Sequence, residues 1–335
     1  MMYKTLASNL PERLRILDYL DKVHESEIGQ EILAGLQQPH KCIPSKYFYD
    51  AHGSWLFEQI CSLPEYYLTR TELALLKQRA PEIMAFFSQE SGDLVELGSG
   101  SNQKVKILLE AAGAALGNIR YVPVDISVEA LYEASRELLE LHEDLHVLGL
   151  IADFTRRLDF LPQGRKLITF LGSTIGNFDR EERIAFLRRI ASIMHPGDRF
   201  VVGLDMVKPV SIVEAAYNDS QGVTAAFNKN ILRNLNRLLN ADFKVDDFEH
   251  LATYREDLER VEMHLRARRP SSATIGDLDL AVDFLPGETI RTEICQKFSR
   301  NRTIRDFQAA GLQAVGWYSD PSDWFSLVIL QKNAG

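Results

Sequence analysis

Cysteine is scarce in this sequence, and long apolar runs are missing altogether. The 335 residues include three cysteines, Cys42, Cys61 and Cys295. An odd number of widely separated cysteines fits neither a disulfide framework nor a paired-cysteine metal site, which favours a reducing compartment. No stretch approaches the roughly 20 apolar residues of a membrane-spanning helix, and Met1–Leu10 has neither the basic start nor the apolar run of a secretion signal. A cytoplasmic protein without membrane contact is therefore predicted.

The sequence also gives little support for a polyanionic partner or a metal ion. Its 47 acidic residues outnumber the 38 basic ones, for a formal net charge of -9. Nucleic-acid surfaces normally carry clustered positive charge, whereas the densest basic stretch, Arg266, Arg268 and Arg269, is typical of an exposed strand face. The eight histidines are scattered along the chain, so no metal site is predicted. A monomer that binds no nucleic acid is the simplest expectation.

The spacing of apolar residues predicts an α/β protein. Helical spacing predicts that Pro11–Gln37 is mainly helical. From Gly92 onward, short apolar runs bounded by glycine or aspartate alternate with helical stretches, as in a parallel sheet covered by helices. Strands are expected at Leu94–Leu97, Arg120–Val124, Val147–Ile151, Leu167–Leu171 and Phe200–Leu204, and helices at Lys104–Ala115, Val128–Leu141 and Arg180–Met194.

After Asp205 this alternation stops, and an α+β region is predicted. A helix is expected at Val223–Leu239, with strands at His250–Tyr254, Arg260–Arg268 and Leu278–Phe284. The end of the chain, with a helix at Thr303–Ala310 and strands at Ala314–Trp317 and Leu327–Gln331, can complete the first sheet. We therefore predict two discontinuous domains: residues 71–207 with 298–335 bind the cofactor, and residues 1–70 with 208–297 bind the substrate.

Three expected strands end on residues suited to a nucleoside. The first runs into the glycine turn Gly98–Gly100, but Gln103 breaks the G-x-G-x-x-G pattern of a dinucleotide site. Asp125 ends the second strand, where a carboxylate can accept hydrogen bonds from ribose hydroxyls. Asp153 and Phe154 end the third, with an acceptor for the adenine amino group and an aromatic face for its ring. This order favours S-adenosylmethionine and a methyltransferase.

The same residues also suit structural roles that need no ligand. The glycines can simply allow a tight turn, and Asp125 can cap the helix that follows it. Among functions of a different class, a nicotinamide-dependent oxidoreductase is disfavoured by Gln103, and a noncatalytic binding module would account for the fold alone.

Four strings carry a family resemblance: SKYFYD at Ser45–Asp50, LPEYY at Leu63–Tyr67, FLGSTIGN at Phe170–Asn177 and GVTAAFN at Gly222–Asn228. With them, from about Ile43 to Leu330, the chain resembles the histidine-specific methyltransferases of ergothioneine biosynthesis, which convert histidine into its trimethylated betaine, hercynine. The resemblance implies a Rossmann-like class I methyltransferase sheet with a second, α+β substrate-binding lobe. It also implies S-adenosyl-L-methionine as the methyl donor and the activity of an L-histidine N-alpha-methyltransferase.

The resemblance also implies the site residues. The expected contacts of S-adenosylmethionine are Tyr49, Gly98, Lys104, Asp125, Asp153 and Phe154. The expected contacts of the free amino acid are Tyr66, Gly172, Asn177, Tyr217, Met263, Glu293 and Cys295. Asn177 and Tyr217 would hold the substrate carboxylate, and Glu293 would recognise the imidazole. We place Tyr66 near the amino group that loses a proton, so Tyr66, Asn177 and Tyr217 are the expected catalytic residues.

The amino-acid acceptor has an alternative. Cys295 stands where the family pattern has a serine, and a thiol is a weaker hydrogen-bond partner than a hydroxyl. Another amino acid, such as tryptophan or tyrosine, is the alternative substrate, although Glu293 and Met263 match the histidine pocket. Each residue also suits an ordinary structural role: half-buried tyrosines at Tyr66 and Tyr217, a turn at Asn177, a strand surface at Glu293, and core positions at Met263 and Cys295.

Overall fold

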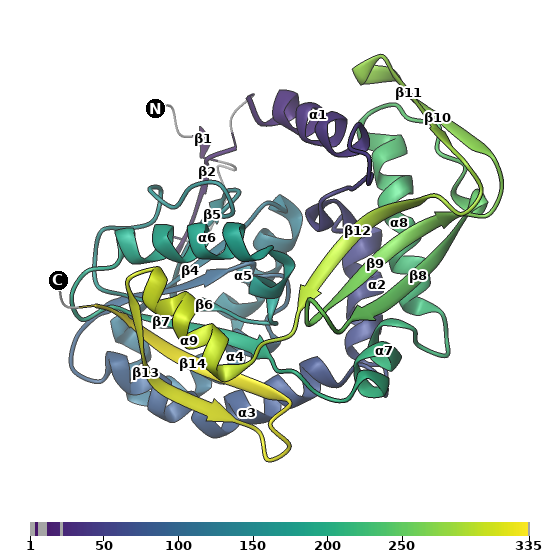
Figure 1. The fold of residues 1–335 in the computed structure, drawn as a ribbon. Coiled ribbons are helices and arrows are strands. Elements are labelled where there is room, and N and C mark those ends of the chain that lie inside the picture. The colour runs from purple at the N-terminus through teal and green to yellow at the C-terminus, as the bar shows by residue number, and fades with distance from the viewer. Residues whose placement is uncertain (1–3, 6–11, 21–22, 334–335) are drawn as a thin grey trace. The chain divides into compact units, whose positions relative to one another are not determined.

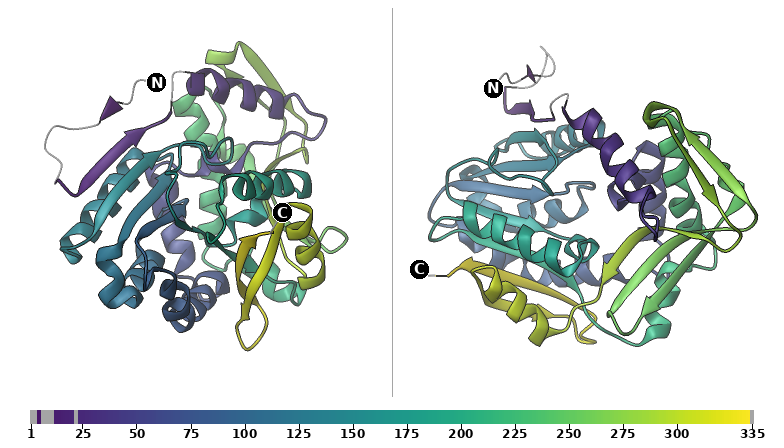
Figure 2. Two further views of the ribbon diagram at one scale, coloured as in Figure 1. Left: turned by 90° about the vertical axis from the view of Figure 1, so that its left-hand side faces the viewer. Right: turned by 45° about the horizontal axis from the view of Figure 1, so that its top comes forward.

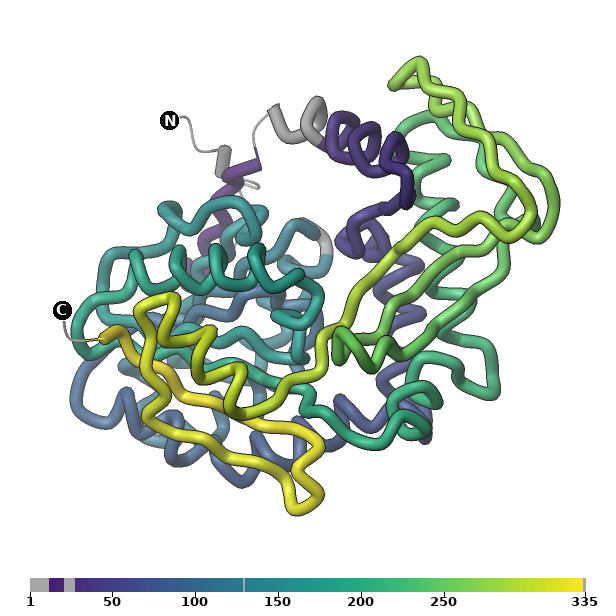
Figure 3. Tube along the Cα trace, viewed as in Figure 1, coloured from purple at the N-terminus to yellow at the C-terminus, as the bar shows by residue number. Residues whose placement is uncertain are grey.

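The computed structural model describes residues 4–5, 12–20 and 23–333. The chain forms two compact units, traced in Figure 3. The first unit contains Met1–Asp21, Thr71–Met206 and Phe298–Gly335, and the second contains Lys22–Arg70 and Val207–Lys297. Each unit is therefore assembled from segments that are far apart in the sequence.

The first unit is built on a nine-stranded sheet with the order β1-β2-β5-β4-β3-β6-β7-β14-β13 (Figure 1). Its strands are β1 Lys4–Thr5, β2 Leu14–Asp18, β3 Gly92–Leu97, β4 Ile119–Asp125, β5 His146–Ile151, β6 Lys166–Phe170, β7 Arg199–Asp205, β13 Leu312–Ser319 and β14 Phe325–Lys332. The strands from β2 to β7 run parallel, and β14 joins β7 antiparallel. All five strands expected between residues 94 and 204 are confirmed, and so are the two at the carboxyl end.

Helices cover both faces of this sheet (Figures 1 and 2). They are α3 Tyr67–Met84, α4 Gln103–Ala112, α5 Val128–Leu141, α6 Arg180–Ile193 and α9 Arg300–Ala309. Successive side chains of a strand point to opposite faces, so Val95 packs in one core with Phe186 of α6, while Leu94 packs in the other with Leu108 of α4. This double burial explains the nearly continuous apolar runs of the parallel strands.

The expectation of a helix throughout Pro11–Gln37 is wrong at its start. Residues 14–18 form β2, which pairs parallel with β5 and belongs to the first unit, not to the predicted substrate domain. The buried residues Leu14 and Ile16 follow strand alternation, and the Arg13 guanidinium donates to the carbonyl of His142 at 2.8 Å. The helix α1 occupies only Val23–Leu36, while residue 11 and residues 21–22 lie outside the described residues.

The second unit is α+β, as predicted. A three-stranded antiparallel sheet has the order β12-β9-β8, formed by Thr289–Gln296, Arg260–Ala267 and Phe248–Arg255, and a separate hairpin pairs β10 Ser271–Ile275 with β11 Leu280–Phe284. The helices α2 Ala51–Cys61, α7 Val210–Tyr217 and α8 Val223–Leu238 belong to the same unit. The predicted helix from Val223 is thus confirmed. A strand pattern was recognised around Glu293, but no bounds were predicted for β12.

Buried asparagines of α8 hold the second unit together. The Asn228 amide donates to the carbonyl of His264 and accepts a hydrogen bond from the Thr292 hydroxyl, at 2.9 and 2.6 Å. Asn230 donates to the carboxylate of Asp50 at 2.8 Å, and Asp50 in turn caps the amino end of α2. A helix that carries amides on its buried face therefore fixes both the β-sheet and the segment that precedes α2.

Candidate active site

The carboxyl ends of neighbouring strands in the first unit gather the residues expected to bind a nucleoside. In the sheet β4 lies on one side of β3 and β6 on the other, so the strand order reverses beside β3. Open α/β sheets bind ligands at such a switch point. Gly98 directly follows β3 and has a φ of 75°, a left-handed conformation that favours glycine. The backbone conformation therefore favours glycine at position 98 whether or not a ligand binds there.

Two acidic side chains and one aromatic ring follow β4 and β5. An oxygen of Asp125 accepts a hydrogen bond from the Ser127 N–H at 2.9 Å, and burial raises the pKa of Asp125. The helix cap of α5 is Ser127, so Asp125 supports the turn without being the cap itself. Asp153 is buried and accepts hydrogen bonds from the N–H and hydroxyl of Thr155. Phe154 packs edge-on against Phe170, with centroids 5.5 Å apart.

Lys104 and Gly172 meet around a residue that sequence reasoning missed, Glu72. This glutamate is only 1% exposed, pairs with Lys104 Nζ at 2.7 Å and accepts the Gly172 N–H at 2.7 Å. A Cβ at Gly172, whose φ is 81°, would lie 3.0 Å from Lys104 Nζ. Lys104 was assigned to the cofactor and Gly172 to the amino acid, yet the structure brings the two together. The available signal was an acid within the apolar face of α3, between Leu68 and Leu75.

A second buried carboxyl, Glu96 of β3, lies beneath the glycine turn. The Tyr121 hydroxyl donates to it at 2.5 Å. Burial raises the pKa of Glu96 to about 7, although this hydrogen bond and the charge of Lys104 act in the opposite direction. Asp125 and Glu72 add repulsion that raises it further. The first unit therefore concentrates acidic groups around one lysine at the predicted cofactor end of the sheet.

Asn177 lies on a short turn after β6. This 3-10 turn occupies Thr174–Asn177 and follows Ser173, which has a φ of 57°. The Ser173 hydroxyl accepts the Asp205 N–H at 2.9 Å, and its carbonyl accepts the Gly176 N–H at 2.8 Å. The turn is thus held to β7, and Asn177 belongs to the first unit, although it was predicted to bind the amino acid.

Aromatic rings of the second unit form a continuous series. Phe57 lies between Tyr49 and Tyr66, with ring centroids 5.7 and 6.3 Å away, and Tyr66 lies 6.4 Å from Tyr217. Tyr49 was predicted to contact the cofactor, and the structure groups it with the tyrosines expected at the amino acid. Burial raises the pKa of Tyr66 well above its usual range, and Cys61 and Cys295 add to this effect. The Tyr66 phenol is therefore protonated at neutral pH.

The β9–β12 pair presents the remaining predicted residues. Glu293 pairs directly with Met263, and Glu293 and Cys295 alternate along β12, so they share a face of the sheet. Burial raises the pKa of Glu293 to about 7, while the charge of Lys297 acts to lower it. The Tyr217 hydroxyl donates to Cys295 Sγ at 2.8 Å. Five of the seven residues predicted for the amino acid, all except Gly172 and Asn177, therefore lie in the second unit.

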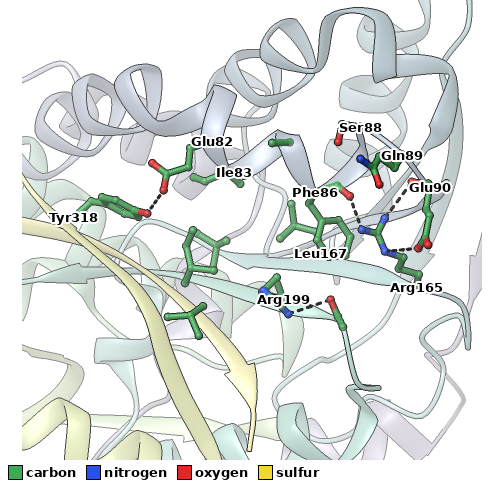
Figure 4. Close-up of a pocket in the computed structure, with 15 residues that line it drawn as sticks. Glu82, Ile83, Phe86, Ser88, Gln89, Glu90, Arg165, Leu167, Arg199 and Tyr318 are labelled. Carbon is green, nitrogen blue, oxygen red and sulfur yellow. Dashed lines mark hydrogen bonds and ion pairs between the residues drawn. The ribbon is translucent and has the colours of Figure 1, made fainter.

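One hollow in the first unit contains none of the predicted residues. It has a volume of about 540 Å³ and is lined by side chains that include Glu82, Phe86, Arg165, Arg199 and Tyr318 (Figure 4). Arg165 and Arg199 flank the amino ends of β6 and β7, at the opposite edge of the sheet from Gly98. Arg165 pairs with Glu90, and the Tyr318 hydroxyl donates to Glu82.

A histidine pair with the spacing H-E-x-x-H escaped the sequence reasoning. His142 and His146 are four residues apart, but His142 caps α5 and His146 begins β5, so they do not share a helical face. Within the described residues, no three His, Cys, Asp or Glu side chains gather as a metal site. No helix in the described part of the chain has the length and apolar character needed to cross a bilayer.

Known proteins match nearly the whole chain. A family model described as histidine-specific methyltransferase, SAM-dependent, matches residues 28–332. The histidine N-alpha-methyltransferase of Mycolicibacterium smegmatis is 41% identical over 316 residues, which cover 94% of this chain and 98% of that protein. The corresponding protein of Mycobacterium tuberculosis is 40% identical over 306 residues, covering 91% and 95%. Ergothioneine biosynthesis protein 1 of Neurospora crassa is 33% identical over 301 residues, covering 87% of this chain and 33% of that protein. The chain is therefore an enzyme that belongs to the family of histidine-specific methyltransferases dependent on S-adenosylmethionine.

Proposed function

We propose that this enzyme transfers methyl groups from S-adenosylmethionine to the α-amino group of free L-histidine and forms the trimethylated betaine hercynine. The observation that carries the proposal is the pairing of Glu293 with Met263 on a sheet face shared with Cys295. An acidic acceptor beside apolar groups suits a side chain that has both a ring and an N–H donor. The relatives named histidine N-alpha-methyltransferase, at 41% and 40% identity, support the same acceptor.

The first unit is proposed to bind the methyl donor. Asp125 would accept hydrogen bonds from the ribose, while Asp153 and Phe154 would receive the adenine. Gly98 would leave room for the ligand beside the backbone, and Lys104 would lie close to the carboxylate of the donor's amino-acid tail. Each of these residues follows, or lies near, the carboxyl end of a parallel strand.

The second unit is proposed to supply the amino-acid contacts. Glu293 would accept the imidazole N–H, and the Tyr217 hydroxyl would donate to the substrate carboxylate. Asn177 and Tyr217 belong to different units, so their joint role on the carboxylate remains a prediction. Tyr49 is proposed to contact S-adenosylmethionine on the strength of the family resemblance alone.

The chemistry needs positioning more than a covalent intermediate. A neutral nitrogen attacks the sulfonium methyl in line, and the sulfur leaves as a neutral thioether. Because the Tyr66 phenol keeps its proton at neutral pH, Tyr66 would orient the amino group and leave proton removal to water. Tyrosine rings also attract the growing ammonium through cation–π contacts, by about 0.5–2 kcal/mol.

The setting of the reaction is part of the proposal. We expect a cytoplasmic monomer without nucleic-acid or membrane partners. The net charge of -9 and three cysteines that form no disulfide support this expectation.

Mass spectrometry of the product tests the proposed function. Incubation with histidine and excess S-adenosylmethionine should yield histidine carrying three additional methyl groups on its α-nitrogen. A panel of free amino acids tests the alternative that Cys295 raises, methylation of tryptophan or tyrosine. Methylation of either of these in the absence of a histidine product would reject the proposed acceptor. Binding of NAD in place of S-adenosylhomocysteine would reject the proposed reaction class.

A further inference from the structure

Lys297 is a fully buried lysine, with 0% exposure, directly after β12 in the second unit. Burial of an ammonium group is costly unless nearby polar groups compensate it. Lys297 Nζ lies 3.0 Å from the Tyr217 hydroxyl oxygen and 3.2 Å from Cys295 Sγ. These distances close a triangle with the 2.8 Å contact between Tyr217 and Cys295. The Lys297 amino group therefore lies within hydrogen-bond distance of the residue proposed to hold the substrate carboxylate.

The geometry fixes the direction of the hydrogen bonds. An ammonium group only donates, so the Tyr217 oxygen accepts from Lys297 and its own proton must point elsewhere. In the structure that proton goes to Cys295 Sγ, which is a weak acceptor. A hydroxyl that accepts a charge-assisted hydrogen bond also becomes a stronger donor. The triangle thus holds Tyr217 ready to give its proton to a better acceptor, such as a carboxylate.

The register of β12 accounts for the arrangement. Glu293, Cys295 and Lys297 lie at every second position and follow the alternation of a strand, so they share a face. The Lys297 N–H continues the pairing by donating to the Glu259 carbonyl at 2.7 Å. The charge of Lys297 also lowers the pKa of Glu293 against the effect of burial. One side chain therefore acts on both the acidic and the phenolic ends of the proposed amino-acid site.

We infer that Lys297 is a positioning residue for the substrate carboxylate, which it acts on through the hydroxyl of Tyr217. The inference rests on the proposed function, because it presumes that Tyr217 binds an amino-acid carboxylate. Lys297 supplies the positive charge that balances the carboxylate and orients the phenol that touches it.

Comparing the binding of histidine and histamine isolates the effect of Lys297 on the substrate carboxylate. Histamine has the imidazole and amino group of histidine but no carboxylate. In Lys297→Met the Kd of histidine should rise about 10- to 100-fold, the range expected for a lost charged hydrogen bond, while the Kd of histamine changes less than about twofold. Lys297→Arg should restore part of the preference for histidine. Binding of S-adenosylhomocysteine should stay unchanged and reports that the variants fold.

A double variant tests whether Lys297 acts through Tyr217. The losses of histidine affinity in Lys297→Met and Tyr217→Phe should be less than additive in the double variant, because both remove one shared interaction. Fully additive losses, or equal weakening of histidine and histamine, would overturn the inference. If Lys297→Met does not bind S-adenosylhomocysteine, Lys297→Gln replaces it in the same comparisons.

Failure of the proposed function gives a different result. A wild-type enzyme that binds histamine as tightly as histidine, or methylates neither, rejects carboxylate recognition at the proposed site and the inference that rests on it. A wild-type enzyme that prefers histidine, together with a Lys297→Met variant that keeps the full preference, rejects the role of Lys297 alone.

Discussion

Glu293 stands directly opposite Met263 in the antiparallel pairing of β12 with β9. Their side chains share a face of the sheet, so a titratable acceptor lies beside a buried thioether. Burial raises the pKa of Glu293 to about 7, so both protonation states are populated near neutral pH. At the proposed amino-acid site, Glu293 would accept an N–H of the substrate side chain, and Met263 would pack against its ring.

Replacing Glu293 with glutamine should damage histidine recognition more than donor binding. Glu293→Gln keeps the size of the side chain but removes its charge, so the KM of histidine should rise at least about tenfold. The Kd of S-adenosylhomocysteine should change less than about twofold. Steady-state kinetics and calorimetric titration measure the two quantities.

Glu256→Gln is the matched control, because Glu256 is an exposed residue of the turn between β8 and β9. It should leave both quantities unchanged. Equal losses of histidine use and donor binding in Glu293→Gln would contradict a role in the amino-acid site.

Alanine substitutions at Gly98 and Gly100 should show whether each glycine is needed for the backbone conformation or for ligand binding. A Cβ on Gly100 would meet nothing within 4 Å, and its φ is ordinary, so Gly100→Ala should change the free energy of unfolding by less than about 0.5 kcal/mol. It should still weaken S-adenosylhomocysteine binding if the ligand lies against this turn. Gly98→Ala, with its φ of 75°, should also lose about 1–2 kcal/mol of stability. Unchanged binding in Gly100→Ala would place the ligand away from the turn.

Sequence patterns predicted the central sheet well because its strands are buried on both faces. Val95 and Leu94 of β3 enter different cores, so apolar side chains line both faces of the strand, and Gly92 and Gly98 mark its ends. β2 was mistaken for helix because Leu14, Leu17 and Leu20 fit helical spacing. The alternation of Leu14 with Ile16 that marks the strand extends over only five residues.

The candidate site was predicted less completely, since buried charges are visible only once their partners are known. Glu72 and Lys297 are 1% and 0% exposed, and their residue types alone favour the surface. Glu72 is explained by Lys104 and the Gly172 N–H, which lie 32 and 100 residues further along the chain. For Lys297 the strand alternation recognised at Glu293 was an available signal, but no bounds had been predicted for β12.

Stability should fall as pH rises through neutrality, and Glu96 should cause part of that fall. Its pKa is about 7 in the folded chain against an ordinary 4.5, so the folded state keeps a proton that the unfolded state releases. The stabilisation is therefore complete below about pH 4.5 and is lost as pH rises through 7. One such group changes the free energy of unfolding by at most about 1.4 kcal/mol per pH unit. Urea denaturation at pH 5, 6, 7 and 8 measures the slope.

Glu96→Gln should flatten this slope relative to the wild type, because glutamine does not titrate and still accepts the Tyr121 hydrogen bond. Other groups change the absolute slope, so the difference between the two proteins is the quantity to compare. Parallel pH profiles would show that Glu96 ionises normally.

Asp125→Asn tests the donor site without disturbing the turn that supports it. The amide oxygen of asparagine can still accept the Ser127 N–H, which Asp125 accepts at 2.9 Å, so the melting temperature should stay close to that of the wild type. The lost charge should weaken S-adenosylhomocysteine binding about tenfold or more, because a ribose hydroxyl donates more strongly to a carboxylate than to an amide. Adenosine should lose affinity by a similar factor, whereas 2′,3′-dideoxyadenosine, which lacks both hydroxyls, should lose little. If all three ligands weakened equally, Asp125 would act on the turn and not on the ribose.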